Sequence, residues 1–492
     1  MLHRLAIELA PEFSQRPSTQ KQYDATCSLS LVCVCRGADA TVAQASSPAS
    51  SGDVSSPEFR VGRGRPLNSQ SRRLRYAKQI LSLRERVRVR GKGSAGRSSR
   101  GTLQGLLNSW CLSLVALLSL PHCSGWLSAQ EEFDINRSGG VKRIPMSMEG
   151  YSGEALSVLR FDLEIQGFEI TSADKAQYLV SGNNNSSVVG RVTDRINKAS
   201  LLAKEYTGGT TRSEAHAFSD DIVEKITARK GIARTKIAFK VENGPNSEIL
   251  VADYDGHNAI AVTRDQTITR DPAWVPGRRI LYYTSYKAGN PDIYSHDLQS
   301  GGRRTFAGYP GLNSGAAPSP DGRRVAMVLS KGGSPDIYVC DADRSNLKQL
   351  TKTKEAESSP CWSPDGQTIC FSSRAQGTSA LFLVPANGGS MRKLGAVGAG
   401  NCTEPDWSPD GKSIVFTRLA GDFEICVVPA SGGSVTPLVA GEDPSWAPNS
   451  RTVIFTRRVK GKRVVSLLDV PTKQTKDIQQ TSGSCSQPSW AK

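Results

Sequence analysis

The stretch Pro360-Cys361-Trp362-Ser363-Pro364-Asp365-Gly366 decides how this chain folds, because near copies of it recur through the second half of the sequence. The other five copies begin at Asp271, Pro318, Pro405, Pro444 and Pro488. The second proline of the motif falls at 276, 320, 364, 409 and 448, which gives steps of 44, 44, 45 and 39 residues. A period of about 40 to 45 residues built from short strands is typical of propeller blades. The sequence therefore predicts a β-propeller over residues 235–492.

Each copy of the motif is followed by short apolar strands. The Asp-Gly pair supplies the positive φ that a tight turn needs before the next strand begins. We interpret the motif tryptophan as a structural wedge buried between neighbouring blades. The first strands after the turn align as Ile280–Tyr283, Val325–Val328, Ile369–Ser372, Ile414–Thr417 and Val453–Thr456.

The number of copies predicts six blades and explains the end of the chain. The last motif, at Pro488, lacks the strands that should follow it, whereas the first blade, from Ile237, lacks the motif that should precede it. We therefore expect the C-terminal strand to close the ring beside the first blade, which removes an open sheet edge.

Residues 141–230 have a different pattern, which predicts a small α/β domain. Strands are expected over 142–148, 168–170, 178–182, 187–196 and 200–206, and helices over 154–163 and 214–226. In the second helix, Phe218, Ile222, Val223 and Ile226 form the side that we expect to be buried. We expect an exposed polar face from Glu214, Ala217, Asp220, Asp221, Glu224 and Lys225.

The charge of the chain is distributed unevenly. Of the net charge of +16, residues 1–130 contribute 18 basic and 7 acidic groups, and residues 131–492 contribute 44 and 39. The later part has no basic cluster with interleaved aromatic residues, which argues against nucleic-acid binding. Residues 1–100 are rich in Ser, Arg and Gly, and we expect this leader to be disordered.

Residues 101–129 have the order of a secretory signal peptide. Arg97 and Arg100 precede an apolar run from Leu103 to Leu120, and small residues follow up to Gln130. The simplest explanation for its internal position is a translation start near residues 90–105, with the preceding leader spurious or dispensable. A membrane anchor and a lipoprotein signal through Cys123 are alternatives, but the run is shorter than the ~20 apolar residues of a stable span. Residues 130–140 then read as a mobile strap.

We find no catalytic or zinc-binding pattern. The six cysteines after the leader are scattered without paired CxxC motifs, which favours buried core positions. His216, His257 and His296 are far apart in sequence with no acidic or cysteine partner at ligand spacing, so we interpret them as packing or surface residues. A Gly-x-Ser-x-Gly elbow and a phosphate-binding glycine loop are both missing from the sequence. The chain is therefore not expected to be an enzyme.

One position in the repeat could form a site. The residue before the motif proline is Asp271, Ser359, Glu404, Asp443 or Gln487, and radial repetition turns one position per blade into a ring. The carboxylates of Asp271, Glu404 and Asp443 are candidates to hold a Ca²⁺ ion or a basic side chain of a partner at the channel mouth. The alternative is that these side chains cap local turns. The sequence leaves both interpretations open.

Three runs outside the repeats, at 216–227, 231–238 and 247–258, carry a family resemblance. They contain His216-Ala217-Phe218-Ser219-Asp220-Asp221, Gly231-Ile232-Ala233-Arg234-Thr235-Lys236 and Ala252-Asp253-Tyr254-Asp255-Gly256-His257-Asn258. In these runs the chain resembles the TolB family, the periplasmic component of the Tol–Pal envelope system. The resemblance covers roughly residues 131–492 and implies a small α/β domain followed by a six-bladed propeller in the periplasm.

The resemblance also implies a non-catalytic scaffold that supports outer-membrane integrity and cell division. It implies that the propeller mouth binds the peptidoglycan-associated lipoprotein Pal and that the strap binds the inner-membrane protein TolA. By position, the Pal-facing residues are Leu312, Asn313, Ser314, Glu357, Ser358, Thr403, Glu404 and Asp443, and Leu312 stands where some members have histidine. The strap falls on Glu132, Phe133, Asp134, Ile135 and Asn136. We expect a monomer.

Two other functions fit a periplasmic propeller. It could bind a peptide or polysaccharide, or it could be a relative of the prolyl-peptidase propellers that has lost its catalytic domain. Recovery of a peptidoglycan-linked lipoprotein from solubilised envelope, or hydrolysis of proline peptides, separates these alternatives.

Overall fold

The computed structural model describes residues 141–479 and 482–492. The predicted leader (1–100), signal peptide (101–129) and strap (130–140, with Glu132, Phe133, Asp134, Ile135 and Asn136) lie outside the described residues. Within the described part, none of the helices has the length and apolar character needed to cross a bilayer.

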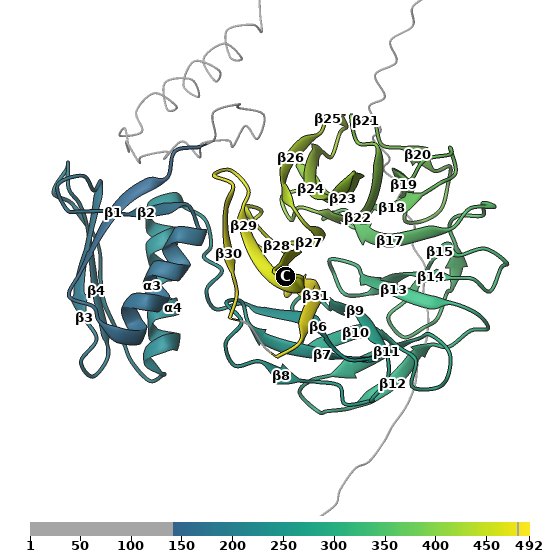
Figure 1. Ribbon diagram of the computed structural model, residues 1–492, viewed down its shortest axis with the longest axis horizontal. Helices are drawn as coiled ribbons and strands as arrows, with labels where there is room; N and C mark the ends of the chain where they lie inside the picture. Colours follow the sequence, from purple (N-terminus) through teal and green to yellow (C-terminus); the bar gives the residue numbers. More distant parts are fainter. Residues whose placement is uncertain (1–140, 480–481) are drawn as a thin grey trace, which may run out of the picture. The chain divides into compact units, whose positions relative to one another are not determined.

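Six four-stranded antiparallel sheets form the propeller, as the repeat predicts. Figure 1 shows these sheets, here called blades I to VI, succeeding one another around a central axis. From the innermost strand outward, blades I to III are β31 (Ser484–Trp490), β6 (Lys236–Asn243), β7 (Asn246–Asp253) and β8 (Ile260–Ala261); β9 (Thr269–Trp274), β10 (Ile280–Ser285), β11 (Asp292–Asp297) and β12 (Arg303–Ala307); and β13 (Asn313–Pro318), β14 (Arg324–Leu329), β15 (Asp336–Asp341) and β16 (Lys348–Gln349).

Blades IV to VI follow the same order. They are β17 (Glu357–Trp362), β18 (Thr368–Ser373), β19 (Ala380–Pro385) and β20 (Arg392–Lys393); β22 (Asn401–Trp407), β23 (Ser413–Ala420), β24 (Asp422–Pro429) and β26 (Thr436–Ala440); and β27 (Glu442–Trp446), β28 (Thr452–Val459), β29 (Lys462–Asp469) and β30 (Gln474–Asp477). A short parallel pair, β21 (Ala396–Val397) and β25 (Gly433–Ser434), links blades IV and V.

The C-terminal strand closes the ring, which confirms the prediction made from the incomplete first and last repeats. Strand β31 runs antiparallel to β6, with Ser484 opposite Glu242 and Trp490 opposite Ile237. Blade I is therefore built from the two ends of the propeller sequence, and β31 covers the edge of β6 that would otherwise be open.

The motif tryptophans pack between blades, as expected of wedges. Trp362 of blade IV lies in a core cluster with Ala326, Val328 and Ile337 of blade III, and its indole N–H donates to the carbonyl of Ala317 at 2.8 Å. Trp274, Trp407, Trp446 and Trp490 pack in the same way against the preceding blade. Each apolar wedge thereby excludes water from one seam.

Residues 144–227 form a five-stranded sheet and two helices. The sheet order is β2-β1-β3-β4-β5, built from β1 (Ile144–Glu149), β2 (Phe168–Ile170), β3 (Tyr178–Asn183), β4 (Val188–Asp194) and β5 (Ser200–Tyr206). Strand β1 pairs in parallel with β2 and β3, and the remaining pairs are antiparallel. The helices α3 (Gly153–Ile165) and α4 (Thr211–Thr227) pack their apolar sides into one core with the sheet.

The predicted exposure of the α4 polar face is wrong for two residues. Glu214 is buried and accepts the backbone N–H groups of Val188 and Gly209 at 3.1 and 3.2 Å. Asp220 is buried as well, and it accepts from the Ala233 N–H and the Arg234 guanidinium at 2.8 Å each. Both carboxylates satisfy backbone donors of neighbouring segments, a role that helical spacing alone does not reveal.

Candidate functional site

The residue before the motif proline occupies a left-handed conformation in every blade. The φ angle is 53° at Asp271, Ser359 and Glu404, 56° at Asp443 and 52° at Gln487. The sixth position, in blade III, is Gly315 with a φ of 60°. In each blade the pairing between the innermost strand and its neighbour shifts at this residue, so it is the extra residue of a β-bulge. We call these six residues the ring.

The ring residues line a common cavity of about 250 Å³, here called the mouth cavity, together with Arg270, Ser314 and Ser358. The sequence therefore predicted correctly that one position per blade converges at one end of the channel. It missed Gly315, because blade III has Ala316 where the other blades have the first proline of the motif. The constant spacing of the second proline was the signal that could have found it.

Four ring residues form a continuous belt of hydrogen bonds between blades. The backbone N–H of Asp443 donates to Glu404 Oε2 at 3.0 Å, and the N–H of Gln487 donates to Asp443 Oδ2 at 3.1 Å. The N–H of Asp271 in turn donates to Gln487 Oε1 at 3.2 Å. Each side chain thus accepts the bulge N–H of the next blade, a donor that the shifted pairing releases from the sheet. Among the described residues, the belt of hydrogen bonds does not continue to Gly315 and Ser359.

Hydroxyl groups on the second strands of blades V and VI support the half-buried carboxylates of Glu404 and Asp443. Thr417 Oγ1 donates to Glu404 Oε2 at 2.7 Å, and Thr456 Oγ1 donates to Asp443 Oδ2 at 3.0 Å. Burial and the nearby carboxylates of Glu404 and Glu442 raise the pKa of Asp443 to about 7. Burial also raises the pKa of Glu404. At neutral pH this part of the ring therefore carries less negative charge than its composition suggests.

This geometry differs from the turn-capping alternative, because Glu404 and Asp443 each bond to the backbone of the next blade. Asp443 and Glu404 accept from neighbouring backbone and hydroxyl donors, and Asp271 accepts from Arg270 Nε at 2.9 Å and Gln487 Nε2 at 3.0 Å. Across the described ranges, no group of three or more His, Cys, Asp or Glu side chains is arranged to hold a metal ion. The candidate cation residues Asp271, Glu404 and Asp443 are thus occupied by hydrogen bonds to the protein itself.

The motif prolines form the next level of the channel. Pro272, Pro360, Pro405, Pro444 and Pro488, with Ala316 in blade III, line both the mouth cavity and a larger cavity beyond it. We call these six residues the proline collar. Proline has no backbone N–H, so it fits directly after a bulge without leaving a donor unsatisfied at the channel wall.

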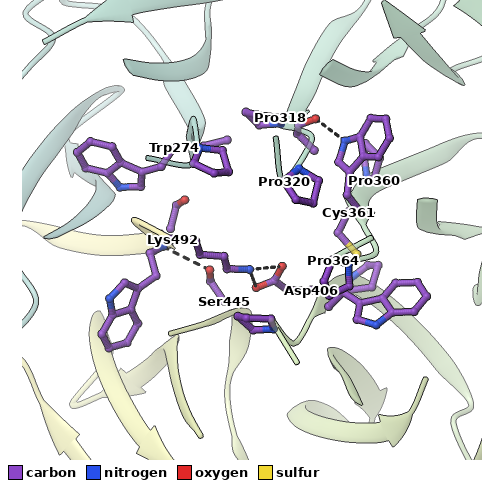
Figure 2. A pocket seen from close by; sticks show the side chains of 18 of the residues that line it. Trp274, Pro318, Pro320, Pro360, Cys361, Pro364, Asp406, Ser445 and Lys492 are labelled. Atoms are coloured by element: carbon purple, nitrogen blue, oxygen red, sulfur yellow. Dashed lines mark hydrogen bonds and ion pairs between the residues drawn. The ribbon is translucent and has the colours of Figure 1, made fainter. Parts of the chain in front are cut away.

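The larger cavity has a volume of about 560 Å³ and is lined by prolines, motif tryptophans and a few polar groups. Figure 2 shows Lys492 reaching Asp406, whose carboxylate it contacts at 2.8 and 2.9 Å. Asp406 Oδ2 also accepts the backbone N–H of Trp446 at 2.7 Å. The lining of this end of the channel is therefore mainly apolar, and its polar groups include the Lys492–Asp406 ion pair and the hydroxyls of Ser445 and Ser489.

Two of the residues predicted to face a partner are buried instead. Asn313 is fully buried, and its amide donates to the carbonyls of Tyr309 and Pro291 at 2.7 and 3.2 Å. Glu357 is 1% exposed and accepts from the hydroxyls of Thr351 and Thr353. Both side chains fix the loop that leads into the innermost strand, so the expectation that they contact a partner directly is not supported.

The other predicted positions lie at or beside the mouth cavity. Ser314, Ser358, Glu404 and Asp443 line the cavity, and Thr403 lies next to Glu404 on β22. Leu312 is half-buried and packs against the core between blades III and IV. The available surface at this end is therefore formed by serine and threonine hydroxyls and by the ring, rather than by the complete set predicted from the sequence.

The structure also brings together the runs that carry the family resemblance. His216 Nδ1 on α4 lies 2.8 Å from Asp162 Oδ2 on α3, and its Nε2 lies 3.6 Å from Asp255 Oδ2 in the turn after β7. His257 Nδ1 lies 3.3 Å from the same Asp255 oxygen, and Tyr254 donates its hydroxyl to Asp162. His216 is buried and His257 is partly exposed, in keeping with packing and surface roles, and both have acidic partners in space that their spacing in the sequence does not reveal. We call Asp162, His216, Tyr254, Asp255 and His257, with Arg212, the joint cluster.

The joint cluster connects the helices of the α/β part to blade I. Arg212 contacts Asp255 and also donates to Glu154 Oε1 at 3.1 Å. The six described cysteines are all buried within the propeller core, as the packing interpretation predicts.

Comparisons with known proteins agree with this architecture. The family model described as the TolB beta propeller domain matches residues 223–492, just over half of the chain. A Tol-Pal system protein TolB of Polaromonas naphthalenivorans is 30% identical over 236 residues, which are 41% of this chain and 55% of that protein. Its counterpart of Histophilus somni strain 2336 is 42% identical over 105 residues, 21% of this chain and 24% of that protein.

The chain spans about half the length of the Polaromonas relative and about a quarter of the Histophilus relative. The crystal structure of TolB from Acinetobacter baumannii aligns with a TM-score of 0.66 at 22% sequence identity, covering 72% of this chain and 97% of that one. This likeness concerns the fold. Because the family model covers the whole propeller, the chain belongs to the TolB beta propeller family.

Proposed function

We propose that this protein is a non-catalytic periplasmic scaffold of a Tol–Pal system, which binds a peptidoglycan-associated lipoprotein at the mouth cavity of its propeller. The observation that carries the proposal is the match of residues 223–492 to the TolB propeller family. Relatives over this region are named Tol-Pal system proteins, which favours the same system for this chain.

The geometry of the mouth cavity supports a protein partner rather than a substrate. Its lining combines the apolar proline collar with ring residues, hydroxyl groups and Arg270, and several of these polar groups are already hydrogen-bonded within the propeller. A rigid surface of this kind binds by shape and hydrogen bonding with little reorganisation. Contact with a TolA-like inner-membrane protein through the strap remains a proposal that rests on the resemblance alone.

Affinity capture tests the proposal. The protein is immobilised and exposed to detergent-solubilised envelope of the same organism, and the bound proteins are identified by mass spectrometry. We expect recovery of a lipoprotein that is linked to peptidoglycan. Hydrolysis of proline peptides, or capture of polysaccharide without a lipoprotein, contradicts the proposal.

A matched pair of variants locates the contact. Ser314→Arg places a long cation in the mouth cavity, whereas Ser300→Arg places the same side chain in the exposed β11–β12 turn at the opposite end of the propeller. We expect Ser314→Arg to abolish capture and Ser300→Arg to leave it unchanged. Equal capture by both variants contradicts binding at the mouth.

A further inference from the structure

A polar groove lies between blades IV and V, outside the channel. It has a volume of about 470 Å³. Ser358 lines both this groove and the mouth cavity, so the groove begins at the same end of the propeller as the ring. Thr403 and Asn401 form its wall on the side of blade V.

The groove exists because blade V has a longer hairpin than blade IV. Strands β23 and β24 contain eight residues each, whereas β18 and β19 contain six. The added length brings Leu419 directly opposite Phe423 in the pairing of β23 with β24, and both side chains line the groove. Leu419 is 47% exposed, so the hairpin presents to solvent an apolar side chain that is not buried in the propeller core.

The opposite wall offers one unpaired cation. Arg374 follows β18 at the groove, and none of the described residues forms an ion pair or hydrogen bond with its guanidinium. The hydroxyls of Ser358 and Ser372 bond to each other at 3.0 Å, and Ser379 donates to the Cys402 carbonyl at 2.7 Å. Arg374 is therefore a cationic donor in the groove that is free for a ligand, and its planar fork matches a carboxylate.

The carboxylate of Glu355, the other charged group of the groove, limits where an occupant can carry negative charge. Glu355 lines the groove and forms no ion pair with Arg374. An anionic ligand that filled the groove evenly would be repelled by Glu355. An occupant with one carboxylate at Arg374 and an apolar group at Leu419 and Phe423 satisfies all of these features, and a protein segment carries both groups on neighbouring side chains.

We propose that this groove is a second contact of the partner-binding mouth, which receives an extended segment of the docked protein through one acidic side chain at Arg374 and one apolar side chain at Leu419 and Phe423. The proposal rests on the proposed function, because it places the same partner on both the mouth cavity and the groove. The groove adds affinity and orientation, since it lies off the propeller axis and marks one of the six otherwise similar seams.

Titration calorimetry tests the groove, with the soluble domain of the organism's peptidoglycan-associated lipoprotein as the probe. Arg374→Glu reverses the unpaired charge, and Leu419→Asp removes the apolar contact. Lys331→Glu is the matched control, because Lys331 is an exposed cation on the corresponding hairpin of blade III, outside the groove. We expect each groove variant to weaken binding by about tenfold or more, and the control by less than about threefold.

Three other results are informative. If the wild-type protein binds and the groove variants bind equally well, the groove inference is overturned while the proposed function stands. If Lys331→Glu weakens binding as much as Arg374→Glu, the effect is one of general rim charge, and the inference is again overturned. If the wild-type protein does not bind the lipoprotein, the proposed function fails and the groove inference fails with it. Both substituted positions are exposed, and an unchanged thermal transition verifies that the variants fold.

Discussion

Replacing Asp162 with alanine removes the centre of the joint cluster. Asp162 is fully buried and accepts from both His216 Nδ1, at 2.8 Å, and the Tyr254 hydroxyl. Breaking a buried ion pair by removing one partner costs about 3–5 kcal/mol. Leaving the hydroxyl of Tyr254 without its acceptor costs about 1–3 kcal/mol, and the two contributions overlap. We therefore expect Asp162→Ala to lower the free energy of unfolding by about 4 kcal/mol.

The cost should depend on pH. Burial lowers the pKa of His216, but its hydrogen bond to Asp162 and the charges of Asp162 and Asp255 outweigh burial, so that the pKa is raised above its ordinary value of 6.5. A raised histidine pKa stabilises the folded state fully below the ordinary value, and this stabilisation is lost as the pH rises through the folded pKa. Asp162→Ala should therefore cost more near pH 6 than near pH 9.

Urea unfolding followed by tryptophan fluorescence measures the effect, because Trp490 packs against Tyr254 with ring centroids 6.2 Å apart. Glu154→Ala is the control, since Glu154 is on the same helix and contacts Arg212 but is 53% exposed. An exposed ion pair contributes about 1 kcal/mol or less. If Asp162→Ala destabilises no more than Glu154→Ala, or equally at both pH values, the joint cluster does not hold the structure in the way described.

Three further predictions concern the ring, its closure and the α/β core. The pKa of Asp443 is raised from 3.8 to about 7, so the folded state resists ionisation of this carboxyl and wild-type stability falls as the pH rises through this interval. The melting temperature of Asp443→Asn, relative to that of wild type, should therefore increase between about pH 4 and about pH 8. A difference that stays constant with pH would argue against this. Deletion of residues 485–492 removes most of β31 and with it the pairing to β6, so we expect loss of cooperative thermal unfolding, and an unchanged transition would contradict closure by this strand. Gly190→Ala places a methyl group 2.2 Å from the Phe218 ring and should cost about 1–3 kcal/mol in denaturant unfolding, whereas Gly395→Ala, whose added carbon meets nothing within 4 Å, is the control and should change little.

Most of the fold follows from the sequence because the repeat is regular. The spacing of the second prolines fixes the number of blades, and the two incomplete repeats, at Pro488 and Ile237, complete each other only if the ring closes there. The wedge role of Trp362 follows from its large apolar surface beside a turn. These features depend on local sequence patterns that recur in each repeat.

The candidate site is less visible in the sequence because it depends on contacts between segments. Asn313 and Glu357 read as polar loop residues, but the structure uses their side chains to satisfy backbone and hydroxyl groups of adjacent loops. His216 and Asp255 are separated by a linker and two strands, so no spacing rule pairs them. The positive φ at Glu404 is equally hidden, since its cause is a register shift within the sheet. Only Gly315 hints at this conformation.

The proline collar has a consequence for anions in the channel. Five of its six residues are prolines, which cannot donate a backbone hydrogen bond. At this level the channel wall is therefore formed mainly by the methylene groups of proline side chains. A chloride or phosphate ion at this level of the channel finds no backbone N–H donor on these five residues to replace the hydrogen bonds of its water shell. The collar is therefore a poor resting place for an anion compared with the polar groups that line the cavity on either side of it.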